Sequence, residues 1–185
     1  VKPGRTVAVF GAGGVGVNAV QGAVLAGART IIAVDRFDSR LEQARRFGAT
    51  HTVNAGEVDA VATIRELTDG RGVDYAFEAV GLPGVMQQAY DSLAKRGVAM
   101  LVGIPPATAE VTISPVSMVY EERVLAGSLY GSAAPKTDIP WMIGLYRGGG
   151  LKLDELLTHR FPIEEINEAY DSLQSVETLR SVVTF

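Results

Sequence analysis

The chain contains no cysteine, and this absence limits its chemistry. Disulfide bonds cannot form, and zinc sites built on thiolate ligands are excluded within this chain. Histidine is scarce too, since the chain has only His51 and His159. Each lies in a short strand-like segment, where a structural or surface role is favoured over metal binding. Two isolated histidines cannot supply the three ligands of an open zinc site, so we expect no metal site in this chain.

Other features that would indicate particular partners or reactions are also missing. The net charge is −4, whereas proteins that bind nucleic acid or anionic membranes are typically basic. No apolar run approaches the length of a membrane span, and the first residues lack a signal-peptide pattern, so we expect a cytoplasmic protein. The motifs Tyr-x-x-x-Lys, His-Glu-x-x-His and Gly-x-Ser-x-Gly are absent, so the sequence offers no catalytic residue.

What is present is the composition of a globular chain. Of its residues, 47% are hydrophobic and 21% are charged, which is typical of a globular protein. Its length of 185 residues is enough for one ordinary domain with an appendage. The chain begins at Val1 rather than at a methionine, and Val-Lys-Pro-Gly runs directly into a predicted strand. We therefore expect it to be part of a longer polypeptide.

The most informative stretch is Gly11-Ala12-Gly13-Gly14-Val15-Gly16. An apolar run at 6–10 precedes it and predicts a buried strand, and a small-residue helix is predicted at 15–26. Gly11 would permit the tight turn, Gly13 would let the backbone approach a pyrophosphate, and Gly16 would let the helix pack close to the sheet. The pattern predicts that phosphate groups bind free N–H groups at the positive end of this helix.

A second predicted strand, at 30–34, ends in Asp35, which follows Gly11 by 24 residues. This spacing is near that of a carboxylate that binds a ribose, where it could accept both ribose hydroxyls. We expect NAD to be preferred over NADP, because a 2′-phosphate beside Asp35 would meet a like charge. Arg36 and Arg40 could offset that repulsion, and we expect Arg36 to flank the adenine.

The chain alternates between predicted strands and helices up to about residue 130, which predicts an α/β fold, doubly wound, with a parallel sheet covered on both faces. The later strands are predicted at 50–53, 73–80, 97–102, 111–113 and 124–130, and the helices at 38–47, 58–67, 84–93 and 115–120. Beyond them, a helix is predicted at 138–146, strands at 158–161 and 180–185, and a helix at 163–173. The buried stripe of that last helix is predicted to contain Ile163, Ile166, Tyr170 and Leu173.

Several motifs, found in order along the chain, resemble those of zinc-containing medium-chain alcohol dehydrogenases. They are KPG at 2–4, GAGGVG at 11–16, AVD at 33–35, FGATH at 47–51, DGRGVDYAFEAVG at 69–81, LVGIPP at 101–106 and LRSVVTF at 179–185. The resemblance covers all 185 residues. It implies a Rossmann domain with six parallel strands in the order 3-2-1-4-5-6 over residues 1–131. It also implies that residues 132–185 return to a catalytic domain, whose N-terminal part is absent from this chain.

The resemblance implies roles for residues at the phosphate and ribose end of the cofactor. Asp35 would bind the adenosine ribose, and Arg40 would reach the ribose or the adenosine phosphate. Arg180 would contact the pyrophosphate. The loop residues that would bind the pyrophosphate are Gly11, Gly13, Gly14, Val15 and Gly16.

At the nicotinamide end, the resemblance implies an apolar lining. Val80, Val102 and Ile104 would form a wall beside the ring, and Val15 would lie beneath it. Val80, Val102 and Ile104 could instead be ordinary core aliphatic residues, and Arg180 could be only a surface charge.

The resemblance further implies an NAD-dependent oxidation of an alcohol to an aldehyde or ketone. Zinc would act as the Lewis acid, held by ligands upstream of this chain, so we expect the chain alone to be inactive. A homodimer is implied through the sheet edge at 111–113 and 124–129.

An alternative is a dinucleotide-binding module of a zinc-free medium-chain reductase, or a non-catalytic nucleotide sensor. In the zinc-free branch the glycine motif usually begins with alanine, whereas here it begins with Gly11. Cysteine, histidine and glutamate at zinc-ligand spacing in the upstream sequence would decide between the two.

Overall fold

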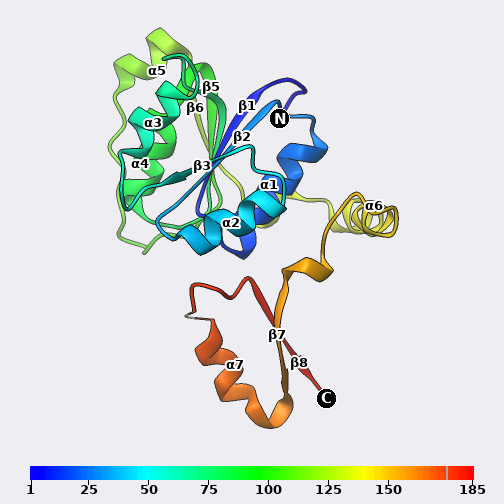
Figure 1. Cartoon of the computed structure of the whole chain (residues 1–185). Coiled ribbons are helices and arrows are strands. Elements are labelled where there is room, and N and C mark those ends of the chain that lie inside the picture. Colours follow the sequence, from blue (N-terminus) through cyan, green and yellow to red (C-terminus); the bar gives the residue numbers. More distant parts are fainter. Residues whose placement is uncertain (174) are drawn as a thin grey trace. The chain divides into compact units, whose positions relative to one another are not determined.

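The computed structural model describes residues 1–173 and 175–185, which form two compact units, Val1–Ser132 and Ala133–Phe185 (Figure 1). The first unit contains a six-stranded parallel sheet with the strand order β3-β2-β1-β4-β5-β6. This is the order of the Rossmann fold, so the predicted fold class and topology are confirmed.

The strands of this sheet form from the apolar runs of the sequence, because strands covered on both faces have few polar positions. In β1 all five residues are buried. The strands are β1 (Thr6–Phe10), β2 (Thr30–Asp35), β3 (His51–Asn54), β4 (Val73–Glu78), β5 (Leu93–Leu101) and β6 (Val124–Gly127). The helices are α1 (Gly14–Leu25), α2 (Asp38–Arg46), α3 (Ala60–Glu66), α4 (Pro83–Asp91) and α5 (Pro115–Glu121), followed by the 3-10 turn η1 (Tyr130–Ser132).

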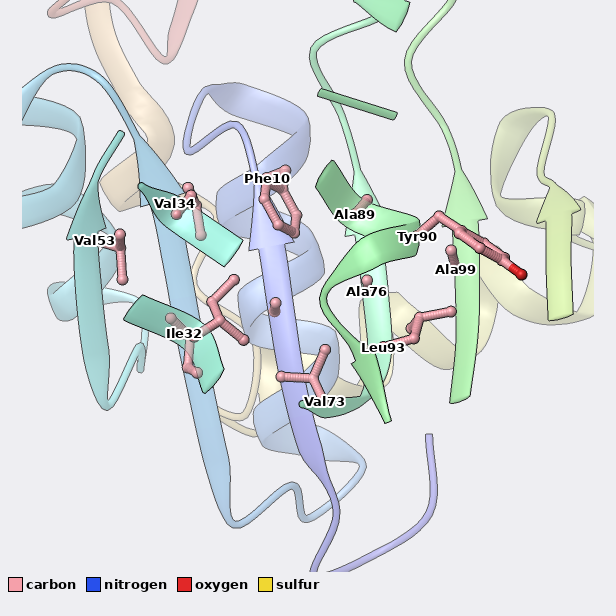
Figure 2. Packing of buried hydrophobic residues seen from close by; sticks show 13 residues of the cluster. Phe10, Ile32, Val34, Val53, Val73, Ala76, Ala89, Tyr90, Leu93 and Ala99 are labelled. Carbon is pink, nitrogen blue, oxygen red and sulfur yellow. The ribbon is translucent and has the colours of Figure 1, made fainter. Parts of the chain in front are cut away.

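The core lies on both faces of this sheet, because successive side chains of a strand point to opposite sides. Ala8 and Phe10 of β1 belong to the same buried cluster as Ile64 of α3 and Tyr90 of α4, and Figure 2 shows Phe10 and Tyr90 among its side chains. The buried cluster on this face comprises Ala8, Phe10, Ile32, Val34, Val53, Ala60, Ile64, Val73, Ala76, Ala89, Tyr90, Leu93 and Ala99.

On the other face, α1 and α2 contact β1, β2 and β3. Val17 and Val20 of α1 and Leu41 and Ala44 of α2 are buried there. Helices thus cover both faces. Because the strands are parallel, their carboxyl ends all lie at the same end of the sheet, which we call its carboxyl edge.

At the amino ends of the strands, Asp74 of β4 forms hydrogen bonds with Thr6 of β1. Its Oδ2 accepts hydrogen bonds from the backbone N and the Oγ1 of Thr6, each at 2.8 Å. Its Oδ1 lies 3.2 Å from Nη1 of Arg5. Burial raises the pKa of Asp74, but the two hydrogen bonds from Thr6 and the positive charges of Arg5 and Arg71 outweigh it and bring the pKa below its ordinary value.

Two predicted strands of this unit need correction. The segment 111–113 is not a strand; Ile113 packs against the core cluster instead, and β6 is the edge strand. The strand predicted at 124–130 ends at Gly127, because the chain turns into η1, where Tyr130 and Ser132 have left-handed φ values of 50° and 52°.

The strand predicted at 97–102 begins earlier. Leu93, predicted as the last residue of a helix, is the first residue of β5 and pairs with Val73 of β4. Leu93 is fully buried. An apolar residue at this position fits the end of a buried helix as well as the start of a buried strand, so apolar periodicity did not separate the two.

The second unit contains a two-stranded parallel sheet made of β7 (Leu157–Pro162) and β8 (Arg180–Thr184). Its other elements are α6 (Pro135–Arg147), η2 (Asp154–Leu156), η3 (Ile163–Glu165) and α7 (Ile166–Ser172). The predicted helices and strands of this part are present.

The buried stripe predicted for the helix at 163–173 is wrong. Ile163, Tyr170 and Leu173 are exposed, whereas Ala169 is the buried residue of α7. The helix packs on β7 and β8, and two strands cover only a narrow strip of its surface. Among the residues that the structure describes, no helix is long and apolar enough to cross a membrane.

Candidate dinucleotide-binding site

The glycine-rich loop turns the chain from β1 into α1 at the carboxyl edge of the sheet. Gly11 has a φ of +90°, a value that favours glycine, and its N–H donates to the carbonyl oxygen of Val34 on β2 at 2.8 Å. A Cβ atom at Gly16 would lie 1.6 Å from the carbonyl oxygen of Gly11. Glycine at both positions is therefore what allows α1 to start this close to the end of β1.

The first turn of α1 is open. Gly13 is the N-cap residue, no side chain caps the helix, and the first turn contains no acidic residue. A Cβ atom at Gly13 would meet no atom within 4 Å. Because the first N–H groups of a helix have no acceptor within the helix, those of Gly14, Val15 and Gly16 are oriented for an external anion. This arrangement fits a pyrophosphate.

Asp35 ends β2 beside this loop, and its side chain is only 6% exposed. Its Oδ2 accepts from the buried N–H of Ala12 at 2.8 Å, and its Oδ1 accepts from the N–H groups of Arg36 and Phe37 at 2.8 and 3.2 Å. The carboxylate thus links the glycine-rich loop to the turn after β2. A carboxylate has about four acceptor positions, so roughly one remains for a hydroxyl group.

Two arginines lie next to this carboxylate and share one aromatic ring. The guanidinium carbons of Arg36 and Arg40 lie 5.0 and 5.5 Å from the centre of the Phe37 ring. Nη1 of Arg40 lies 3.9 Å from Oδ2 of Asp35. The site therefore places the positive charge of Arg40 close to the carboxylate, and a cation–π contact with Phe37 orients both arginines.

The turns that follow β4 and β5 lie against the loop and against each other. A Cβ atom at Gly11 would lie 2.7 Å from Cγ2 of Val80, so Val80 lies against the glycine-rich loop. A Cβ atom at Gly81 would lie 2.6 Å from the carbonyl oxygen of Ile104. At this edge the chain leaves large aliphatic side chains in contact with solvent, which suits a flat aromatic ligand. We call these residues the apolar wall: Val15, Val80, Val102 and Ile104.

No function was predicted for Glu78, the last residue of β4, yet it is fully buried beside the apolar wall. Its Oε1 accepts from the N–H groups of Val80 and Gly81 at 2.8 and 2.7 Å. The available signal was an acidic residue inside the strand predicted at 73–80; only in the structure does β4 end at Glu78, as β2 ends at Asp35.

The remaining candidates lie elsewhere. His51 is an exposed residue of β3 beside Thr50, and His159 in β7 stacks on Phe161. Within residues 1–173 and 175–185, no group of three histidine, aspartate or glutamate side chains could hold a metal ion. Arg180, the exposed first residue of β8, belongs to the second unit, whereas the other predicted site residues all lie in the first.

Comparisons with known proteins identify the family. Residues 14–147 match the family model of the zinc-binding dehydrogenases. The class-3 alcohol dehydrogenase of Cereibacter sphaeroides is 38% identical over 193 residues, which cover 100% of this chain and 51% of that protein.

Two solved structures are also similar. Benzyl alcohol dehydrogenase from Acinetobacter calcoaceticus is 35% identical with a TM-score of 0.95, and the match covers 99% of this chain and 50% of that one. An alcohol dehydrogenase zinc-binding domain protein from Burkholderia ambifaria is 41% identical with a TM-score of 0.95, over 100% of this chain and 50% of that one. The chain spans about half the length of these relatives. By sequence and by fold, the chain belongs to the zinc-binding dehydrogenase family.

Proposed function

We propose that this chain is the NAD-binding part of an alcohol dehydrogenase. The observation that carries the proposal is the open N-terminus of α1, enclosed by a loop in which Gly11 and Gly16 leave no room for side chains, with Asp35 beside it. The names of the relatives, which are alcohol dehydrogenases, support the reaction class.

In this proposal, different residues of the first unit bind different parts of the cofactor. Asp35 accepts a hydrogen bond from the adenosine ribose, and Arg36 and Arg40 flank the adenosine. The apolar wall lies against the nicotinamide ring and keeps water from that face. Bound NAD supplies the acceptor for a hydride removed from an alcohol carbon. The pyrophosphate contacts come from the backbone N–H groups of Gly14, Val15 and Gly16, and Gly11 and Gly13 form the turn that leaves these groups open.

Zinc does not fit the residues of this chain. The sequence has no cysteine, and the described residues contain no group of three metal ligands. We therefore assign no zinc to the chain. The oxidation of an alcohol to an aldehyde or ketone is proposed for a longer protein, in which other residues supply the metal site.

We also propose a domain division, a cellular location and a dimer for the protein. Residues 1–131 would be the dinucleotide-binding domain, and residues 132–185 would return to the catalytic domain, in a cytoplasmic enzyme. Two chains would pair through β6, because this edge strand leaves unpaired backbone groups and Val124 is 46% exposed.

The proposed pyrophosphate site at the first turn of α1 is tested with Gly13→Asp. The new side chain has room, and aspartate is a favourable N-cap residue, so the variant should fold as well as the parent. Its charge would lie where the pyrophosphate binds, and at a distance of about 5 Å the repulsion should weaken NADH binding at least about tenfold in calorimetric titration.

Gly22→Asp is the matched control, because it adds the same charge to the same helix in open space, away from the N-terminus. Its NADH affinity should stay within about twofold of the parent, a difference of about 0.4 kcal/mol. Unchanged NADH binding by Gly13→Asp would place the phosphates elsewhere and contradict the proposal.

A further inference from the structure

Glu78 places a carboxyl group in the core, and none of the cofactor contacts proposed above involves it. It is 0% exposed. Burying a carboxylate is costly unless hydrogen bonds compensate it, and here the compensation is local. Both bonds to Oε1 come from the turn immediately after β4, from the N–H groups of Val80 and Gly81.

The main chain of Glu78 holds the next turn along the sheet edge. Its carbonyl oxygen accepts from the N–H groups of Val102 and Gly103, at 2.8 and 3.0 Å. One residue thus binds two N–H groups of the turn after β4 and two of the turn after β5. These two turns carry Val80, Val102 and Ile104, which are three of the four residues of the apolar wall.

Glycines make room for the carboxylate between the two turns. A Cβ atom at Gly103 would lie 2.8 Å from Oε2 of Glu78 and 2.2 Å from the backbone N of Gly81. Among the described residues, Oε2 has no hydrogen-bond partner. An acceptor left unsatisfied in the core is unfavourable, so stability alone is a weak reason for a glutamate at this position.

We propose that Glu78 is a positioning residue for the nicotinamide end of the cofactor. Its carboxylate fixes the backbone of Val80 and Gly81, and this sets the apolar wall before the cofactor arrives. Without the carboxylate, two N–H groups lose their acceptor and Val80 leaves its place against Gly11. The adenosine end would be unaffected, because Asp35 and the first turn of α1 make no hydrogen bond to Glu78.

This inference rests on the proposed NAD-binding function, and the experiment separates the two. NADH and ADP-ribose, which lacks the nicotinamide, are titrated into the 185-residue chain and its variants. The unmodified chain should bind NADH more tightly than ADP-ribose. Glu78→Ala should weaken NADH binding about tenfold, equivalent to about 1.4 kcal/mol, and change ADP-ribose binding less than about threefold.

Two further variants distinguish positioning from general stability. Glu78→Gln retains an oxygen that can accept from Val80 and Gly81, so its NADH affinity should return to within about threefold of the parent. Asp74→Asn removes the other hydrogen-bonded carboxylate of β4, at the far end of the strand. It should lower the melting temperature and leave the ratio of the two affinities unchanged.

Amide hydrogen exchange gives a measurement that needs no cofactor. The amides of Val80 and Gly81 should exchange slowly in the parent and faster in Glu78→Ala, whereas the amide of Gly11, which donates to Val34, should not change.

The outcomes are decisive in both directions. If the unmodified chain binds neither ligand, the proposed function fails. If it binds both, the role of Glu78 alone is refuted by any of four results. These are a parent that binds NADH no more tightly than ADP-ribose, equal losses for both ligands in Glu78→Ala, a glutamine variant as weak as the alanine variant, or unchanged exchange at Val80 and Gly81.

Discussion

Replacing Asp35 by alanine tests the choice between NAD and NADP. In the folded chain this carboxylate accepts from the backbone of Ala12, Arg36 and Phe37, which leaves roughly one acceptor position for a ribose hydroxyl. The substitution removes both the negative charge and that acceptor. It also leaves the buried N–H of Ala12 without its partner, which should lower the free energy of unfolding by about 1–3 kcal/mol.

The expected change in cofactor affinity follows from two terms. A hydrogen bond to a charged acceptor contributes about 1.5–3 kcal/mol, so NAD binding should weaken about 10- to 100-fold. Repulsion between the carboxylate and a 2′-phosphate about 5 Å away, at an effective dielectric constant of about 20–40, is on the order of 2–3 kcal/mol. Arg40, whose Nη1 lies 3.9 Å from Oδ2, offsets part of this repulsion. We therefore expect the parent to prefer NAD by about 10- to 100-fold, and Asp35→Ala to bind the two cofactors within about tenfold of each other.

Calorimetric titration of both cofactors measures these affinities, at a temperature where circular dichroism shows each variant to be folded. Asp38→Ala is the matched control, because it removes an exposed carboxylate three residues away that hydrogen-bonds to Asn54. This control should leave the preference unchanged. Equal affinities of the parent for NAD and NADP would refute the reasoning, as would a preference that survives the loss of Asp35.

Three other predictions concern stability and assembly. Because the pKa of Asp74 is lower in the folded chain than in the unfolded chain, its stabilising contribution is complete above about pH 5 and is lost as the pH falls through the folded-state pKa. Denaturant unfolding should therefore find Asp74→Asn less stable than the parent at neutral pH, with a difference that narrows as the pH falls below about 4 and is lost only below the folded-state pKa; a difference independent of pH would contradict this. Gly16→Ala should lower the melting temperature by several degrees, since overpacking against the carbonyl of Gly11 costs about 1–3 kcal/mol or more, whereas Gly22→Ala, in open space on the same helix, should not lower it. The parent should sediment as a dimer at micromolar concentration and Val124→Asp as a monomer; a monomeric parent would rule out pairing through β6.

The residues that form the fold could be recognised locally. A strand buried on both faces appears as an apolar run such as Val7 to Phe10, and a turn that needs a positive φ appears as a glycine such as Gly11. The carboxylate of Asp35 at the end of the second such run followed from its spacing. These signals depend on neighbouring residues, so the α/β class and the glycine-rich loop were determined by the sequence itself. The strand order came from the resemblance to a family, and the structure confirms it.

What the sequence could not decide depended on contacts between residues far apart in the chain. The segment 111–113 has the apolar pattern of a strand, but it lies outside the sheet, where Ile113 packs against the core cluster. Asp35 is held by the N–H of Ala12, 23 residues earlier, so fewer of its acceptor positions remain than its sequence position indicated. Glu78 lies in the strand predicted at 73–80, but nothing in the sequence shows that its carboxylate is enclosed where Gly81 and Gly103 bring two turns together. Residue type and periodicity determine which elements form, whereas only the packed structure determines which polar groups at the ends of the strands become buried and what they hold in place.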